Sequence, residues 1–578
     1  MLPSNLKLAF TLYRIADLLE IEGESPFKIS AYRKAGQTIE RMEIPIEDVD
    51  PETIPGIGKG ITVVIRQWMK TGKSELLAEL EERIPPDLLL LLRIPGLGPR
   101  SVGRLYRELG IDSLSKLEEA AKAQKIRKLT GFGAKTELNL LKSIKQLKEI
   151  PEEIPIASLL PIAREIREWV MNVDGIEKAE AAGDLRRMKE TGKGILFVLA
   201  VRSPDEAVPL LLQFPKVKKV LEKGKEGVTV ELEYLWPIRV DFRLVSPQSF
   251  SSALLYYTGS EAHREKLMVR AKERGIIFTP YGLEGSRKRE TFATEEDLYR
   301  RLGISYIPPE IREGREEVER AVKGEIPRLI RLEDIRGDLH MHTEWSDGGN
   351  SIEEMARAAY KRGYRYIAIT DHSRSLKIAG GLSIERLREQ RQKIREVEKR
   401  LQEEWQDDSF RILAGVEMDI LPDGRLDYPD EVLQELDLVI ASVHTAFKQE
   451  EKVMMKRILA AVENNHVDII AHPTGRLIGR RAPYAVNVEV LIKAAKETGT
   501  VLELNANPNR LDLAPEYLEM AMKEGVPLAI NTDAHRTDEL ENMSVGVGTA
   551  RRGWVEPDLV INTWTLDQLL SFLKRKWS

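Results

Sequence analysis

Ile335-Arg-Gly-Asp-Leu-His340-Met-His342 and Tyr366-Ile-Ala-Ile-Thr-Asp-His372 are two of six segments in which a short apolar run ends in a histidine or a carboxylate. The other four are residues 411–417, which end in Glu417, and residues 438–444, 467–472 and 527–535. Such runs predict β-strands, and stretches with helical periodicity separate them. Strands that alternate with helices indicate a (β/α) barrel, in which the strand ends converge on one face.

The residue types at these strand ends predict a metal centre. Seven of the chain's eight histidines lie between His340 and His535, and all of them except His466 come at the ends of these strands. Imidazoles and carboxylates are ligands that suit borderline divalent metals such as Zn, Mn or Fe. One or two such residues would be ordinary polar groups at loop starts, but six histidines on five strand ends favour a metal-dependent hydrolase. The other two histidines are expected to lie elsewhere: His466 at a helix end on the surface, and His263 in a different domain.

These segments also resemble, in order, the motifs of the polymerase-and-histidinol-phosphatase (PHP) superfamily. The motifs begin with Gly337-Asp-Leu-His340-Met-His342-Thr-Glu-Trp-Ser-Asp347-Gly and end with Thr532-Asp533-Ala-His535. The resemblance implies a distorted seven-stranded barrel over residues 335–578 that holds two or three divalent ions, with Glu417 as the bridge between two of them. It implies Mn²⁺ as the cofactor, with Zn²⁺ or Fe as alternatives. The nine implied ligands are His340, His342, Asp347, His372, Glu417, His444, His472, Asp533 and His535.

Composition sets limits on the rest of the chain. A chain of 578 residues is expected to contain several domains. It has no cysteine, so a metal site must use nitrogen and oxygen ligands. The longest apolar runs are shorter than a membrane span, and the start of the chain does not resemble a signal peptide, so we expect a cytoplasmic, nucleoid-associated protein. The net charge of −5 argues weakly against a nucleic-acid partner, but a chain of mixed sign can carry a basic groove.

Three glycine turns predict DNA binding in the N-terminal part. They are Ile54-Pro-Gly-Ile-Gly-Lys-Gly-Ile61, Ile94-Pro-Gly-Leu-Gly-Pro-Arg-Ser-Val102 and Leu129-Thr-Gly-Phe-Gly-Ala-Lys-Thr136. Each precedes an amphipathic helical stretch and resembles the helix-hairpin-helix motif, which holds the DNA backbone without reading sequence. A single turn of this kind would more often only end one helix and begin the next. The expected DNA-binding residues are Gly56, Gly58, Lys59, Gly96, Gly98, Arg100, Gly131, Gly133 and Lys135.

The middle of the chain resembles the palm and thumb of family X DNA polymerases. The resemblance lies in residues 183–191, in the strand Pro237-Ile-Arg-Val-Asp241-Phe-Arg243 and in Leu255-Tyr-Tyr-Thr-Gly-Ser260. The order of parts is that of bacterial and archaeal members that end in a PHP domain. The positions that match the family's polymerase site are Asp184, Arg187, Gly194, Leu196, Asp241, Tyr256, Tyr257 and Gly259.

Several of these positions depart from the family pattern. Gly194 and Leu196 stand where the family has the two aspartates that hold paired Mg²⁺, and only the third carboxylate, Asp241, remains. Asp184 replaces the serine that binds the triphosphate, and its carboxylate would repel that group. Thr279-Pro280-Tyr281 replaces the thumb's Asn-Glu-Tyr, and Val64 replaces the lysine of lyase-active relatives. These departures predict a polymerase module that survives as a DNA-holding scaffold.

The predicted architecture is multidomain. It comprises a helix-hairpin-helix domain at 1–85, fingers at 86–150, a degenerate α+β nucleotidyltransferase-like palm at 151–248, a thumb at 249–318, a linker at 319–334 and a (β/α)₇ barrel at 335–578. The predicted function is that of a monomeric, metal-dependent 3′–5′ exonuclease on gapped DNA in base excision repair. A gap-filling polymerase that is still active, or an idle DNA-binding scaffold, is the alternative.

Four residues of the barrel are expected to act on the DNA phosphate, directly or through the metal ions. Glu417 would bridge the ions that activate water and neutralise the developing charge. Arg476 and Arg510 follow strand ends and would bind phosphate oxygens, as would Arg480. The alternative for the arginines is that they form ordinary surface salt bridges.

Overall fold

The computed structural model describes residues 3–40, 42, 44–85, 88, 91–94, 97–129, 131–148, 152–234, 236–285 and 288–574. The chain divides into two compact units, Met1–Pro151 and Glu152–Ser578. Within the described ranges, no helix is both long and apolar enough to cross a membrane.

The first unit is helical and is built on a single core. Its buried residues, from Leu8 to Ile144, form one apolar cluster, so the segments predicted as two domains share one interior. Leu8, Leu12, Ile15 and Leu19 recur every three or four residues and are buried, as expected of a core-facing helix stripe. The helices are α1 (Pro3–Glu22), α2 (Pro26–Glu40), α3 (Lys59–Thr71), α4 (Glu75–Arg83), α6 (Pro99–Leu109), α7 (Leu114–Lys122) and α8 (Ala134–Lys148).

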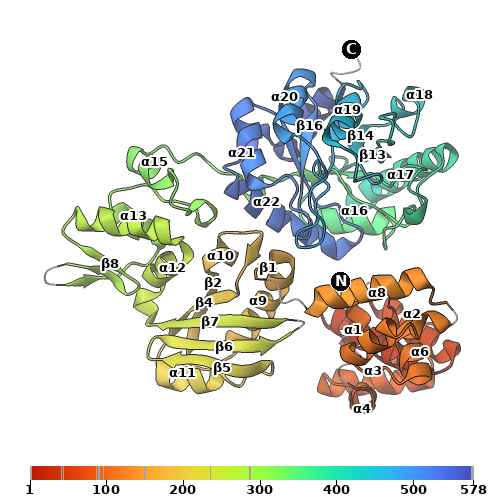
Figure 1. Ribbon diagram of the computed structural model, residues 1–578, viewed down its shortest axis with the longest axis horizontal. Helices are drawn as coiled ribbons and strands as arrows, with labels where there is room; N and C mark the ends of the chain where they lie inside the picture. Colours follow the sequence, from red (N-terminus) through yellow and green to blue (C-terminus); the bar gives the residue numbers. More distant parts are fainter. Residues whose placement is uncertain are drawn as a thin grey trace. The chain divides into compact units, whose positions relative to one another are not determined.

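The second unit begins with a five-stranded palm sheet (Figure 1). Its strand order is β2 (Ile176–Ala182), β4 (Ile195–Val201), β7 (Pro237–Val245), β6 (Gly227–Glu233) and β5 (Val217–Gly224), and only β4 and β7 pair in parallel. Alternate residues of β4 face two different cores, Phe197 and Leu199 one and Val198 the other. The sheet is therefore covered on both faces. Helix α9 (Ile156–Val170) contacts β2, and helix α12 (Phe250–Thr258) contacts β2 and β4. The remaining palm elements are β1 (Ile154–Pro155), β3 (Thr191–Gly192), α10 (Gly183–Arg186) and α11 (Pro204–Leu211).

The thumb has its own core and is joined to the palm by buried ion pairs. Arg312 is fully buried and donates to Glu295 at 2.7 Å, and Arg186 of the palm donates to the same carboxylate. Burial favours the neutral acid, but the charges of Arg312 and Arg186 lower the pKa of Glu295 to about 2. The thumb consists of α13 (Glu261–Lys272), β8 (Ile277–Thr279), β9 (Gly282–Glu284), β10 (Arg289–Glu290), α14 (Glu295–Arg301) and α15 (Glu317–Lys323).

The segment predicted as a linker, 319–334, is packed against both neighbouring modules. It begins inside α15, where Ala321 belongs to the thumb core together with Leu329. The next residue, Ile330, is buried in the barrel core. Its apolar residues give it fixed partners on both sides, which its charged and proline-containing sequence did not indicate.

Seven parallel strands form the barrel and follow one another in sequence order (Figure 1). They are β11 (Gly337–Asp338), β12 (Tyr366–Ile369), β13 (Arg411–Asp419), β14 (Leu438–Ser442), β15 (Ile469–Ile470), β16 (Val501–Asn505) and β17 (Leu528–Asn531). A parallel bridge between Met341 and Ala534 joins the end of the first strand to the end of the last. The predicted multidomain fold class with a (β/α)₇ barrel is thus confirmed.

An outer layer of helices covers these strands, visible in teal and blue in Figure 1. All residues of β12, β14, β16 and β17 are buried, which explains their nearly continuous apolar sequences. The barrel helices are α16 (Ile352–Lys361), α17 (Ile384–Trp405), α18 (Asp430–Leu433), α19 (Glu451–Val462), α20 (Val488–Thr498), α21 (Pro515–Glu524), α22 (Met543–Arg552) and α23 (Leu566–Lys574).

Candidate metal centre

The carboxyl ends of the barrel strands bring the nine predicted ligands to one place. Parallel strands end at the same face of a barrel, so residues that follow them in sequence meet in space. Glu417 lies inside β13, whereas the other ligands follow β11, β12, β14, β15 and β17. Their ligand atoms form three overlapping groups, and within each group all atoms lie within 4.8 Å of one another. The groups are His342, Asp347, His372 and His535; His340, His342 and Asp533; and His372, Glu417 and His444.

Glu417 stands at the centre of this cluster and is 1% exposed. Its two carboxylate oxygens face five imidazoles. His472, which lies outside the three groups, is tied to the cluster through Glu417. The distances from Glu417 are 2.8 Å to His372 Nδ1, 3.0 Å to His472 Nε2, 3.2 Å to His444 Nε2, and 3.5 Å to both His340 Nε2 and His342 Nε2.

The electrostatics show that the cluster attracts positive charge. Burial disfavours a charged imidazole, yet the nearby carboxylates, chiefly Glu417, raise the pKa of His372 to about 10 and that of His444 to about 9. In contrast, burial and the adjacent His372 and His535 lower the pKa of His342 to about 3. Burial alone would raise the pKa of Glu417, but His444 and its neighbours hold that pKa well below its ordinary value.

The atoms left without partners fit a bound metal. Within the described part of the chain, His342 Nδ1 and His472 Nδ1 are buried and have no hydrogen-bond partner. Buried polar atoms are normally paired, so unpaired ones in a cluster point to a missing ion or water. The donor set consists of nitrogen and carboxylate oxygen, which suits divalent transition metals. The residues present therefore fit a divalent-metal centre.

Residues behind the ligands fix the orientation of the imidazoles, and the sequence analysis missed them. Glu503 on β16 lies 2.8 Å from His340 Nδ1 and accepts from the backbone N–H of His472 at the same distance. Asp419 at the end of β13 lies 2.9 Å from His444 Nδ1. Carboxylates that hold the second ring nitrogen of a ligand set its tautomer. The signal for Glu503 was a charged residue inside Val501-Leu-Glu-Leu-Asn505, an otherwise buried strand.

The predicted phosphate-binding arginines occupy different settings. Arg510 lies beside the cluster, with Nε 3.6 Å from Asp533 Oδ2. Arg476 does not face the cluster. Its guanidinium pairs with Glu190 of the palm and donates to the backbone carbonyl of Arg510 at 2.9 Å. Arg480 is exposed. His466 is half-buried just after α19, with its N–H donating to Asn464.

The glycine turns of the first unit adopt the hairpin geometry. Gly56 and Gly131 have φ values of +81° and +89°, a left-handed region that only glycine enters easily. Gly58 and Gly98 are the N-caps of α3 and α6, and Gly133 directly precedes α8. Lys59 and Arg100 are exposed in the first turns that follow, whereas Val64 is buried in α3. Of the other predicted DNA-binding residues, Gly96 and the side chain of Lys135 lie outside the described part of the chain.

Comparisons with known proteins agree with this division of the chain. Family models match residues 3–74 (helix-hairpin-helix domain), 88–146 (SAM-like helix-hairpin-helix tandem), 253–313 (DNA polymerase beta thumb) and 338–507 (PHP domain). A DNA polymerase/3′-5′ exonuclease PolX of Bacillus subtilis strain 168 is 46% identical over 567 residues, which is 98% of either chain. This chain belongs to the PHP-containing PolX family.

Other relatives match the barrel of this PolX-family chain alone. A probable phosphatase of Thermoanaerobacter sp. strain X514 is 32% identical over 255 residues, which cover 41% of this chain and 94% of the relative. A probable phosphatase of Caldanaerobacter subterraneus is 31% identical over 253 residues, or 41% and 91% of the two chains. The hairpin and thumb modules indicate a DNA-binding protein, and the PHP barrel with its histidine and carboxylate cluster indicates a divalent-metal-binding domain.

In the palm of this PolX-family chain, the one remaining carboxylate is already paired within the protein. Asp241 accepts from Thr229 Oγ1 at 2.6 Å and from two nitrogens of Arg239 at 3.0 Å each. Burial favours the neutral acid, but these hydrogen bonds hold the pKa of Asp241 below its ordinary value. Leu196 lies directly opposite Asp241 on the neighbouring parallel strand. Among the described residues, the three metal-type clusters all lie in the barrel, and none includes Asp241.

Gly194 leaves no room for a side chain. A Cβ atom built on Gly194 would lie 2.5 Å from the backbone oxygen of Arg239 and 3.2 Å from its Cβ. Side chains essentially never approach backbone that closely, so the start of β4 is packed around the glycine.

The positions that match the nucleotide-binding residues hold the palm to the thumb. Arg187 is buried, pairs with Asp184 at 2.5 Å, and donates to Glu313 at 3.0 Å and to the carbonyl of Thr258 at 2.6 Å. Asp184 therefore has a cationic partner within the protein, which its sequence position did not reveal.

The thumb side of this region is equally well packed. Tyr256 and Tyr257 pack edge to face, with ring centroids 5.2 Å apart. A Cβ at Gly259 would lie 2.6 Å from the ring of His263, and that histidine is buried 2.7 Å from Glu317. Tyr281 donates from its hydroxyl to Glu226 at 2.5 Å.

Proposed function

We propose that this PolX-family chain is a metal-dependent phosphodiesterase that removes nucleotides from DNA 3′ ends. The observation that carries the proposal is the convergence of five imidazoles on the buried Glu417, with Asp347, Asp533 and His535 beside them. The name of the Bacillus subtilis relative includes a 3′–5′ exonuclease, and other relatives are named probable phosphatases; both support the same reaction class.

The chain's own residues would perform three tasks in this reaction. The nine ligands hold the metal ions, which, when bound, supply an activated water and neutralise charge on the phosphate. Glu503 and Asp419 keep His340 and His444 in the tautomer that presents Nε2 to the cluster. Arg510, beside Asp533, binds a non-bridging phosphate oxygen and stabilises the charge that develops there.

We further propose Mn²⁺ as the working metal, gapped DNA as the substrate, a monomeric state and a role in base excision repair. A ligand set of imidazoles and several carboxylates suits Mn²⁺ and also accepts Zn²⁺ or Fe. The hairpin residues Lys59 and Arg100 would hold the DNA backbone beside a gap. Removal of metal with a chelator should abolish hydrolysis, and Mn²⁺ should restore it better than Zn²⁺ or Mg²⁺.

We also propose that the polymerase centre is inactive. Two divalent ions close together need several anionic ligands, and the palm offers Asp241 alone, which Arg239 and Thr229 already occupy. Arg187, which matches a nucleotide-binding position, is engaged by Glu313 and the carbonyl of Thr258. A nucleotide would have to displace these contacts and then find no metal to coordinate.

Gapped DNA labelled at the primer 5′ end tests these proposals in one experiment. The protein is incubated with Mn²⁺ or Mg²⁺, with and without deoxynucleotides. Shortening of the primer in both cases, abolished by Glu417→Gln and retained by Asp241→Asn, is the expected result. Template-directed lengthening that Asp241→Asn abolishes would show an active polymerase. Binding without either change would show a DNA-holding scaffold and overturn the proposed activity.

A further inference from the structure

The segment that carries Arg510 is shared between the barrel and the palm. It follows β16, and Arg510 extends from it toward Asp533 in the metal cluster. The next residue, Leu511, is completely buried and packs in the core of the palm rather than in that of the barrel. Leu511 also has a φ of +44°, a conformation that a leucine keeps only where its surroundings fix it. The position of Arg510 therefore depends on contacts that the palm provides.

Arg476 is the second contact that fixes this segment. Its Nε donates to the carbonyl of Arg510 at 2.9 Å, and its Nη2 donates to the carbonyl of Leu511. Two consecutive carbonyls are thus held by one guanidinium, which is 14% exposed. A planar guanidinium with several donors in fixed directions sets the orientation of the groups that it binds.

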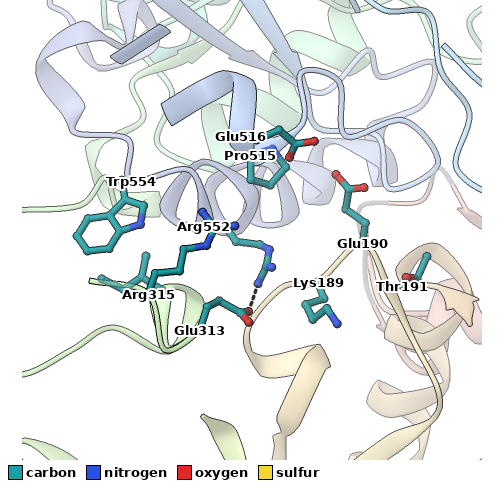
Figure 2. Close-up of a pocket in the computed structure, with 10 residues that line it drawn as sticks. Lys189, Glu190, Thr191, Glu313, Arg315, Pro515, Glu516, Arg552 and Trp554 are labelled. Atoms are coloured by element: carbon teal, nitrogen blue, oxygen red, sulfur yellow. Dashed lines mark hydrogen bonds and ion pairs between the residues drawn. The ribbon is translucent and has the colours of Figure 1, made fainter. Parts of the chain in front are cut away.

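The counter-charge of Arg476 comes from the palm. Glu190 accepts from Nη1 of Arg476 at 3.1 Å and also from Nη2. Glu190 lies between α10 and β3, and its own carbonyl accepts from the N–H of Ile156 at 2.8 Å, which anchors its backbone in the palm. Figure 2 shows its carboxylate directed toward the barrel at the edge of a cavity between the palm, the thumb and the barrel.

We propose that Glu190 is a positioning residue for the barrel chemistry: it orients Arg476, which holds the backbone at Arg510 so that the Arg510 side chain meets the substrate phosphate. The inference rests on the proposed phosphodiesterase function. Loss of the Glu190 charge leaves the Arg476 guanidinium without its anionic partner, so the carbonyls of Arg510 and Leu511 lose their fixed donor. Displacement of a catalytic group by about 1 Å can cost about 10²-fold in rate. The palm therefore contributes to hydrolysis through a contact that needs no bound nucleotide.

A second ion pair across the same junction provides a matched control. Glu310 of the thumb accepts from Arg551 of α22 at 2.8 and 3.1 Å, with exposures of 14% and 17%. The other donor of Arg551 goes to the carbonyl of Ile330. This pair is as well formed as the Glu190–Arg476 pair, but it does not touch the Arg510 segment.

The test compares Glu190→Gln with Glu310→Gln in the full-length, Mn²⁺-loaded protein. The substrates are end-labelled DNA and thymidine 5′-(p-nitrophenyl phosphate), a small phosphodiester that lacks the rest of the DNA chain. For Glu190→Gln we expect kcat to fall about tenfold on both substrates, with metal content and the KM for DNA changed less than twofold. Glu310→Gln should keep kcat within twofold. Equal kcat values in the two variants, or a loss confined to the KM for DNA, would overturn the proposal.

A double-variant cycle identifies the residue through which Glu190 acts. If Glu190 acts through Arg510, Glu190→Gln should change kcat less than twofold when Arg510 is already alanine, because coupled residues are not additive. A full tenfold loss in the Arg510→Ala background would contradict this route. Absence of hydrolysis by the unmodified protein would refute the proposed function. Hydrolysis by the unmodified protein that Glu190→Gln leaves intact would refute only the role of Glu190.

Discussion

Restoration of the two missing palm aspartates should destabilise the protein without producing a polymerase. The double variant Gly194→Asp/Leu196→Asp recreates the carboxylate pattern on β4. At residue 194, however, the new Cβ would lie 2.5 Å from the carbonyl oxygen of Arg239. Arg239 lies inside β7 and pairs with Glu231 of β6, so its backbone cannot move without disturbing two neighbouring strands.

The cost follows from these contacts. Overpacking of a well-filled site costs about 1–3 kcal/mol. Leu196 packs against the core that contains Val198 and Phe250. An aspartate at this position would lose those contacts and would face Asp241 on the neighbouring parallel strand. Together these two effects add about 1 kcal/mol to the destabilisation. For the unit Glu152–Ser578, the sum of about 2–4 kcal/mol corresponds to a fall in Tm of about 2–5 °C. Primer extension should stay undetectable, because Arg187 remains bound to Glu313 and to Thr258.

Calorimetry and primer extension in Mg²⁺ and Mn²⁺ measure the two outcomes. Gly194→Ala alone reports the steric part, and Leu196→Asp against Leu196→Asn reports the charge facing Asp241. Retained hydrolysis of DNA 3′ ends verifies that the barrel is intact in each variant. Template-directed extension by the double variant at an unchanged Tm would refute both the steric reasoning and the proposed inactivity of the palm.

Four further variants test the metal cluster, the thumb and the hairpins. Glu417→Gln removes the central carboxylate of the cluster and should lower kcat by at least about 10³-fold, or about 4 kcal/mol. Elemental analysis should show loss of metal, while DNA affinity stays intact. An unchanged rate and metal content would exclude this cluster as the catalytic site. Glu295→Gln leaves Arg312 buried and unpaired and should cost about 3 kcal/mol in chemical denaturation. The pKa of Glu295 in the folded protein is about 2, below the ordinary 4.5, so the stability that its charge contributes is present above pH 4.5 and is lost as the pH falls toward 2. The free energy of unfolding of the variant should therefore depend less on pH in this range. An identical pH dependence in both proteins would contradict the pairing. Lys59→Ala and Arg100→Ala should each reduce the slope of log Kd against log salt by about 0.9 without changing sequence preference, and an unchanged slope would remove that residue from the DNA interface.

The barrel and its ligands could be predicted because their signals are local. Each buried strand is a short apolar run, and the residue that follows it in sequence also follows it in space, so His372 and His444 could be placed at one barrel face from the sequence alone. Glu503 was missed because its carboxylate lies on a buried strand, where its role depends on His340, 163 residues away. A pattern read along the chain carries no information about such a pair.

Dependence on a distant residue also explains why Arg476 faces the palm and not the metal cluster. Its position after a strand end suggested contact with a phosphate, but its partner Glu190 is 286 residues away on another module. The segment at 319–334 is similar, since its charged and proline-containing sequence is typical of a linker. Burial of Leu329 and Ile330 in two different cores became visible only when both modules were present.

The palm site around Asp241 and the metal cluster of the barrel differ in how the protein balances their charges. In the palm, Asp241 has Arg239 and Thr229 as partners, Leu196 faces it without charge, and the protein itself satisfies its only carboxylate. A centre with one carboxylate lacks the like-charge repulsion that a bound metal would relieve among several clustered carboxylates. In the barrel, the buried Glu417 and Asp533, the exposed Asp347 and six imidazoles converge, and two of the buried imidazole nitrogens have no hydrogen-bond partner among the described residues. A divalent ion therefore gains little in the palm and more in the barrel, so we expect metal to bind to the PHP domain, in line with the proposal that the palm holds the Arg510 segment in place.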